Sequence, residues 1–147
     1  MRIGQITNGP EQVALFVVNG TGTIISQGRG VHLLVGASCD GKVAPIDALN
    51  LKGFLGVANK DIAANTQAGK QGEFATIQGR LQVYVFAHGT SVTIGAGSPM
   101  GPGAAASGGA FSSTGNKNPF GPLLACDTIG ASICSAGGTA YAYVNML

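Results

Sequence analysis

Short runs of apolar and β-branched residues, each ended by glycine or by an Asn-Gly or Asp-Gly pair, limit the fold of this chain most strongly. The 147 residues include 25 glycines. Residues 13–18 and 80–86 are typical strand-forming runs, because branched and aromatic side chains fit a pleated sheet. In the second run Leu81, Val83 and Val85 alternate with Gln82 and Tyr84, which predicts a half-buried strand.

Three pairs of such runs predict β-hairpins, because the residues between them favour tight turns. They join residues 13–18 to 23–26, 31–36 to 42–44, and 73–77 to 80–86. Helix is expected only as single turns at residues 45–49 and at residues 61–64, the latter capped by Asp61. No run supports a helix beyond about two turns.

Two stretches of the chain share one pattern of strand, short turn and strand. Ala58 and Ala125 lie 67 positions apart, as do Ile62 and Ile129. A fainter likeness pairs residues 31–40 with residues 91–99. We interpret the pattern as a weak internal duplication. We predict that the two half-units close into one β-barrel or sandwich, because closure removes exposed strand edges.

The sequence therefore predicts one all-β domain, a compact β-barrel or β-sandwich of short antiparallel strands with almost no helix. Four parts are expected: an N-terminal arm and hairpin (1–29), a first β unit (30–94), a Gly/Ala/Ser/Pro-rich loop (95–119) and a C-terminal β-hairpin (120–147). The loop is expected either to be mobile or to become ordered on a neighbouring subunit.

The composition favours a protein that is bound to other proteins. Only 10% of the residues are charged and the mean hydropathy is +0.30, which indicates apolar surface covered by a partner. We expect a homo-oligomer whose contacts lie in the N-terminal segment and in the 95–119 loop. The candidate interface residues are Arg2, Ile3, Ile6, Met100, Phe111 and Phe120.

Several other classes of function are not expected. The eight basic residues are spread singly along the chain, whereas nucleic-acid binding needs clustered cations. The apolar runs are too short to span a bilayer. The first residues lack the pattern of a secretory signal, so synthesis in a cytoplasm is expected, with Cys39, Cys126 and Cys134 as buried free thiols.

The chemical motifs in the sequence predict neither catalysis nor a cofactor. Residues 36–42 have the Gly-x4-Gly-Lys spacing of a phosphate-binding loop, but Val43 stands where the hydroxyl that binds Mg²⁺ is required. His32 and His88 could meet Cys39 or Asp40, yet no pair of ligands has the spacing of a zinc site. We therefore expect no enzyme, no metal and no cofactor.

Motifs in the middle of the chain carry a resemblance to a known family. Residues 37–45 read ASCDGKVAP, residues 53–58 read GFLGVA, and residues 61–64 read DIAA before the strand pair that begins at Glu73. In this order they resemble small capsid decoration (cement) proteins of tailed phages, over residues 30–86 and more loosely over 123–147. Asn65, where the family pattern has Gly, the added N-terminal hairpin and the long loop depart from it.

This resemblance implies a non-enzymatic structural virion protein on the capsid exterior. Such a protein binds the major capsid protein, commonly as a homotrimer, and stabilises contacts between capsomers. One alternative is a receptor- or glycan-binding fibre or adhesin module, whose marker is exposed aromatic side chains; here aromatic residues make up 6% of the chain and Trp is missing. Another is a small hydrolase that uses Cys39 with His32 or His88.

Overall fold

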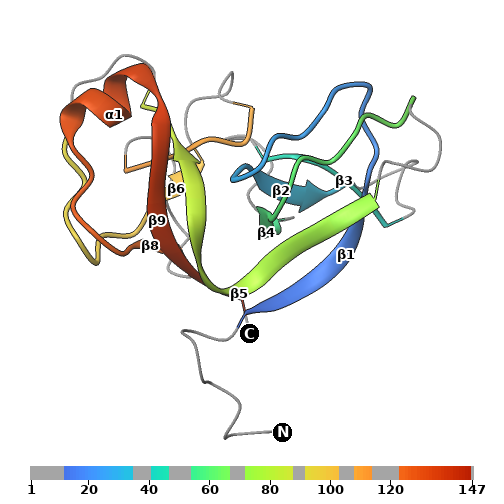
Figure 1. The fold of residues 1–147 in the computed structure, drawn as a ribbon, viewed down its shortest axis with the longest axis horizontal. Coiled ribbons are helices and arrows are strands. Elements are labelled where there is room, and N and C mark those ends of the chain that lie inside the picture. Colours follow the sequence, from blue (N-terminus) through green and yellow to red (C-terminus); the bar gives the residue numbers. More distant parts are fainter. Residues whose placement is uncertain are drawn as a thin grey trace, which may run out of the picture.

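A computed structural model describes residues 12–34, 41–46, 54–66, 72–87, 92–102, 108–113 and 123–146. Within these ranges the chain forms strands and one short helix, which confirms the all-β fold class. Figure 1 shows two lobes joined by one long strand. The elements are β1 (Val13–Asn19), β2 (Gly30–Leu33), β3 (Lys42–Pro45), β4 (Phe54–Ala58), β5 (Gly72–Val85), β6 (Gly101–Pro102), β7 (Phe111–Ser112), β8 (Leu123–Ala125), α1 (Ala131–Ala136) and β9 (Gly138–Asn145).

The first lobe is a closed five-stranded β-barrel. Its strands follow the order β1-β3-β2-β4-β5, and β1 pairs again with β5 to complete the ring. Most of the pairs are antiparallel, as expected, but β1 and β3 run parallel. Since every strand of the ring has two neighbours, the barrel leaves no open sheet edge.

β5 is a continuous strand of 14 residues, where the sequence predicted a hairpin around Gln78-Gly79. Gly79 is buried and has a φ of +126°, a conformation that favours glycine. β5 bends and continues from the first lobe into the second (Figure 1). Its first half pairs with β1, and its second half pairs with β9 over Gln78–Val85.

The two other predicted hairpins had different outcomes. β2 and β3 form the expected antiparallel pair, with Leu33 opposite Val43. Residues 23–26 do not pair with β1. Ile25 forms a β-bridge with Ile62 instead, and the side chain of the fully buried Asn19 binds this segment at Thr23. Its carboxamide nitrogen donates to the carbonyl oxygens of Thr23 (2.8 Å) and Ala63 (3.1 Å), and its oxygen accepts from the Thr21 amide (2.8 Å).

The second lobe repeats the pairings of the first at an offset of 66 to 69 positions. Ile25 and Ile62 exchange backbone hydrogen bonds of 2.9 and 2.8 Å, and Ile94 and Ile129 exchange bonds of 3.0 and 2.8 Å. The parallel β1–β3 pair is matched by a parallel β5–β7 pair. The duplication therefore extends through most of the described chain. Residues 92–99 correspond to residues 23–30, whereas the sequence had matched this segment to residues from 31 onward.

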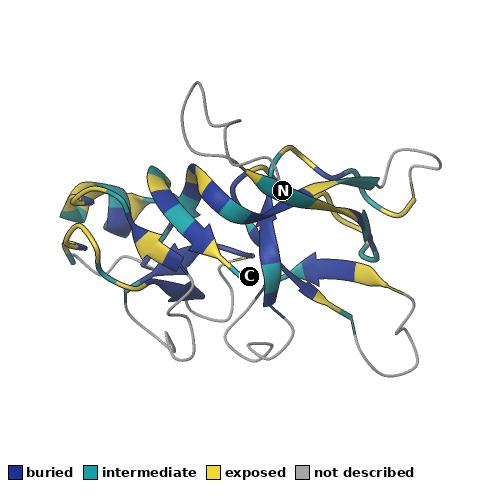
Figure 2. Ribbon diagram, turned by 90° about the horizontal axis from the view of Figure 1, so that it is seen from below, coloured by how far each residue is buried: buried dark blue, intermediate teal, exposed yellow. Residues whose placement is uncertain are grey.

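The core follows the same repeat. One cluster fills the first barrel, and each of its members has a counterpart in the larger second cluster: Val17 and Val83, Ile25 and Ile94, Val31 and Met100, Val43 and Phe111, Ala58 and Ala125, Ile62 and Ile129, Ala75 and Ala142. Figure 2 shows buried residues along the strands of both lobes. The second cluster also contains Ile46, Phe54 and Val57 of the first half, so the cores are not each confined to one half, and the two halves do not close into one shared barrel.

The described parts of residues 95–119 belong to the fold. They contain β6 and β7, and Met100 and Phe111 are fully buried in the second core. The sequence did not predict this, because single large side chains in a Gly/Ala/Ser background show no strand periodicity.

The short helix α1 agrees with the expected upper limit on helix length, but it lies at Ala131–Ala136 and not at the predicted positions. Ile62 forms a β-bridge where a helical turn was expected. Asp61 Oδ1 accepts a hydrogen bond from the Gln27 amide at 2.7 Å, so it fixes a distant turn and caps no helix. Of the other predicted turn, Pro45 ends β3 and residues 47–49 lie outside the described ranges.

Candidate functional site

A pair of exposed aromatic rings on the first barrel is the clearest candidate for a binding surface. In the antiparallel β1–β5 pair Phe16 lies opposite Phe74. Their neighbours Val17 and Ala75 point into the barrel and are buried. Because successive side chains of a strand alternate between its two faces, Phe16 and Phe74 point outward. They are 63% and 47% exposed.

The two rings form an ordered pair. Their centroids are 5.5 Å apart and their planes meet at 78°, an edge-to-face arrangement that suits the aromatic quadrupole. Gly72 leaves room for this arrangement, because a Cβ at that position would clash with the Phe16 ring. The barrel therefore presents a fixed apolar surface.

An exposed aromatic pair contributes little to folding. A cross-strand pair of this kind contributes about 0.2–1 kcal/mol, whereas burial of a Phe side chain contributes about 1.5–3 kcal/mol. More than half of Phe16 and nearly half of Phe74 are left in water in the isolated chain. Adjacent exposed apolar side chains are typical of surfaces that a partner covers.

The sequence did not identify these residues as surface residues. Residues 13–18 are all apolar, so the run shows no alternation that separates an inner from an outer face. A strand whose two faces are both apolar is either buried on both sides or covered by a partner on one side. The absence of alternation in residues 13–18 was therefore the sequence feature that could have indicated a binding surface.

Two of the six predicted interface residues are described, and both are buried. Met100 and Phe111 expose none of their surface and pack in the second core, so as placed they stabilise the fold and offer no area to a neighbour. Arg2, Ile3, Ile6 and Phe120 lie outside the described residues.

The candidate nucleophiles and ligands are not assembled among the described residues. His32 is buried, and its Nδ1 lies 2.9 Å from the Leu33 carbonyl oxygen. Cys39, Asp40 and His88 fall outside the described ranges. Within those ranges no three His, Cys, Asp or Glu side chains are grouped as a metal site requires.

Two of the three cysteines are described, and both are free thiols. Cys134 is fully buried on α1, and Cys126 is partly buried after β8. Burial raises the pKa of the Cys134 thiol, because the charged thiolate loses its hydration. This supports the prediction of a buried, unreactive thiol for Cys134.

Comparisons with known proteins do not identify a family. No protein-family model matches the sequence, and no curated protein is significantly similar to it. In the part of the chain that the structure describes, no helix has the length and apolar character to cross a bilayer.

Proposed function

We propose that this protein is a structural virion protein that binds the outer surface of a phage capsid and stabilises contacts between capsomers. The observation that carries the proposal is the exposed Phe16–Phe74 pair on a closed barrel. A capsid offers many copies of one binding site, so a modest apolar contact repeated over the lattice gives strong overall attachment.

The resemblance noted in the sequence supports this choice of partner. Lys42–Pro45 and Phe54–Ala58, which carry part of the family-like motifs, form β3 and β4 of the same barrel. The proposed partner is the major capsid protein, and the proposed oligomer is a homotrimer. In this proposal the protein acts by binding and catalyses no reaction.

Co-sedimentation with purified capsids that lack the protein tests the proposal. We expect the wild-type chain to pellet with capsids and the Phe16→Ser/Phe74→Ser variant to lose at least about tenfold in affinity, because most of the apolar contact is removed. Leu124→Ser is the matched control, since Leu124 is also exposed and apolar but lies in the second lobe.

Two results contradict the proposal in different ways. Failure of the wild-type protein to bind any capsid would remove the capsid as its partner. Full binding by the double variant, with an unchanged circular dichroism spectrum and melting temperature, would show that the docking surface lies elsewhere. Mass measurement of the bound and free protein tests the trimer.

A further inference from the structure

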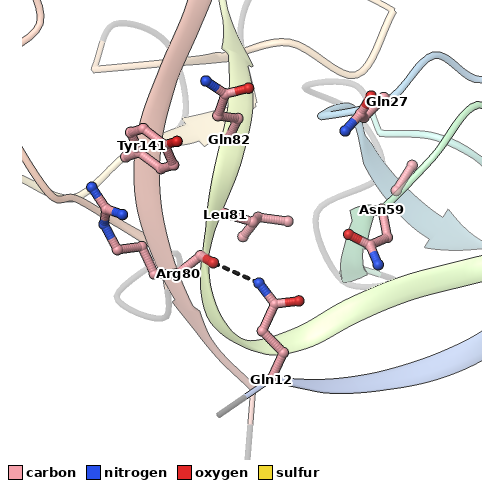
Figure 3. A pocket seen from close by; sticks show the side chains of 8 residues that line it. Gln12, Gln27, Asn59, Arg80, Leu81, Gln82 and Tyr141 are labelled. Atoms are coloured by element: carbon pink, nitrogen blue, oxygen red, sulfur yellow. Dashed lines mark hydrogen bonds between the residues drawn. The ribbon is translucent and has the colours of Figure 1, made fainter. Parts of the chain in front are cut away.

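A small polar pocket lies at the seam between the two lobes (Figure 3). Its volume is about 240 Å³, slightly below the range of drug-sized sites, so it has room for a ligand of about one sugar unit. The polar residues that line it are Gln12, Gln27, Asn59, Arg80, Gln82 and Tyr141. Ala58 and Leu81 complete the lining.

Both lobes contribute to the lining, and their backbones are fixed. The Gln27 backbone N–H donates to Asp61 Oδ1 at 2.7 Å, and the Asn59 backbone N–H donates to the Phe74 carbonyl oxygen at 3.0 Å. Gln82 lies on β5, where it pairs with Tyr141 of β9. The pocket is therefore built on strands and on turns held by hydrogen bonds.

The carboxamide groups give the pocket its chemistry. Gln12 Nε2 donates to the Arg80 carbonyl oxygen at 2.6 Å, which holds one side of the pocket in place (Figure 3). Among the described residues the carboxamides of Gln27, Asn59 and Gln82 have no hydrogen-bond partner. Each can donate and accept at the same group.

The single charge of the lining is at its edge. The Arg80 guanidinium stacks on the Tyr141 ring, with its central carbon 3.8 Å from the ring centroid. In Figure 3 it lies beside Tyr141, on the side of β5 away from Gln27 and Asn59. The lining contains no carboxylate, so its interior is neutral and offers both donors and acceptors.

We infer that this seam pocket binds one residue of a neutral saccharide. Each sugar hydroxyl donates and accepts a hydrogen bond, as each carboxamide does, and three free carboxamides from three segments match several neighbouring hydroxyls. Tyr141, whose ring is stacked against the Arg80 guanidinium, completes the lining at the edge of the pocket. The inference does not depend on the capsid proposal, because a different surface carries it.

Saturation-transfer NMR on the full chain tests the inference with three probes: the methyl glycosides of glucose, galactose and mannose. We expect transfer to at least one of them. In Gln27→Ala/Asn59→Ala we expect at least about tenfold weaker binding, because two hydrogen-bonding groups are lost. Phe16→Ser/Phe74→Ser is the matched control and is expected to bind the sugar normally.

Several results would overturn the inference. These are the absence of transfer from all three glycosides, and equal binding by the wild-type chain and the Gln27→Ala/Asn59→Ala variant. Binding of glucuronic acid alone, lost in Arg80→Gln, would assign the interaction to the guanidinium. Binding of a short Gly/Ser peptide in place of the sugars would assign the pocket to a protein segment. Gln82→Ala, a change at an exposed position of β5, provides a second variant if the first folds poorly.

Discussion

The two lobes have matching backbone pairings but different outer surfaces. In the first lobe Phe16 lies opposite Phe74 on β1 and β5. At the equivalent place in the second lobe Gln82 lies opposite Tyr141 on β5 and β9. The backbone hydrogen bonds and the inward side chains define the shared fold, so outward side chains are free to differ. One lobe thus presents an apolar pair, and the other contributes to a polar pocket.

The two cores also differ in the size of their side chains at equivalent positions. Val31 and Val43 of the first core correspond to Met100 and Phe111 of the second. Met100 directly precedes β6, and Phe111 lies on β7. These two strands have two residues each, whereas β2 and β3 have four. Larger side chains supply buried apolar area where the strands supply fewer residues. A comparable core is therefore reached with less regular structure.

The largest expected effect is at Phe111. We expect Phe111→Ala to lower the free energy of unfolding by about 3–5 kcal/mol, because it leaves a cavity beside Phe54, whose ring centroid is 6.2 Å away. The matched change Val43→Ala removes less volume and is expected to cost about 2 kcal/mol. Urea denaturation measures both values. A loss below about 1 kcal/mol for Phe111→Ala would show that this residue is not part of the core.

The second largest expected loss of stability is at Asn19. The equivalent residue in the second lobe is Val85. Asn19→Ala leaves the carbonyl oxygens of Thr23 and Ala63 without this donor. We expect a loss of about 2–3 kcal/mol, measured by thermal unfolding. Asn65→Ala is the control, because Asn65 makes one exposed hydrogen bond to the Gly20 carbonyl oxygen. Equal losses for the two variants would contradict a special role of Asn19.

The smallest of the three effects is at Gly79, where the lobes join. Alanine at a φ of +126° is strained, so Gly79→Ala is expected to cost about 1–3 kcal/mol. Gly22→Ala is the control, because no atom lies within 4 Å of a Cβ placed there; its effect is expected to stay within about 1 kcal/mol. Urea denaturation compares the two. A neutral Gly79→Ala would show that the bend does not need glycine.

Much of the fold could be predicted from local patterns. The alternation of Leu81, Val83 and Val85 gave a correct buried face, and the spacing of Ile62 and Ile129 revealed the duplication. The hairpin around Gln78-Gly79 was wrong, because a glycine with positive φ allows a bend as well as a reversal, and only the partners β1 and β9 decide between them.

The candidate surfaces could not be predicted from the sequence in the same way. Phe16 belongs to an apolar run without alternation, and Gln27, Asn59 and Gln82 are scattered polar residues with no motif. The three polar residues of the pocket meet because the turn at Gly28 packs against β5. There the Tyr84 backbone amide donates to the Gly28 carbonyl oxygen at 2.9 Å. Long-range contacts of this kind leave no local pattern.

By itself the sequence determined the strand-rich class, the short elements and the repeated unit, because these depend on side-chain shape, glycine and periodicity within a few residues. The tertiary structure alone decided that there are two cores, that the second core also contains Phe54 and Val57 of β4, and that β5 belongs to both halves. It also decided which apolar side chains are buried and which remain outside. The physical reason is that closure of the first barrel and burial of both cores depend on contacts between residues far apart in the chain, as between Ile25 and Ile62.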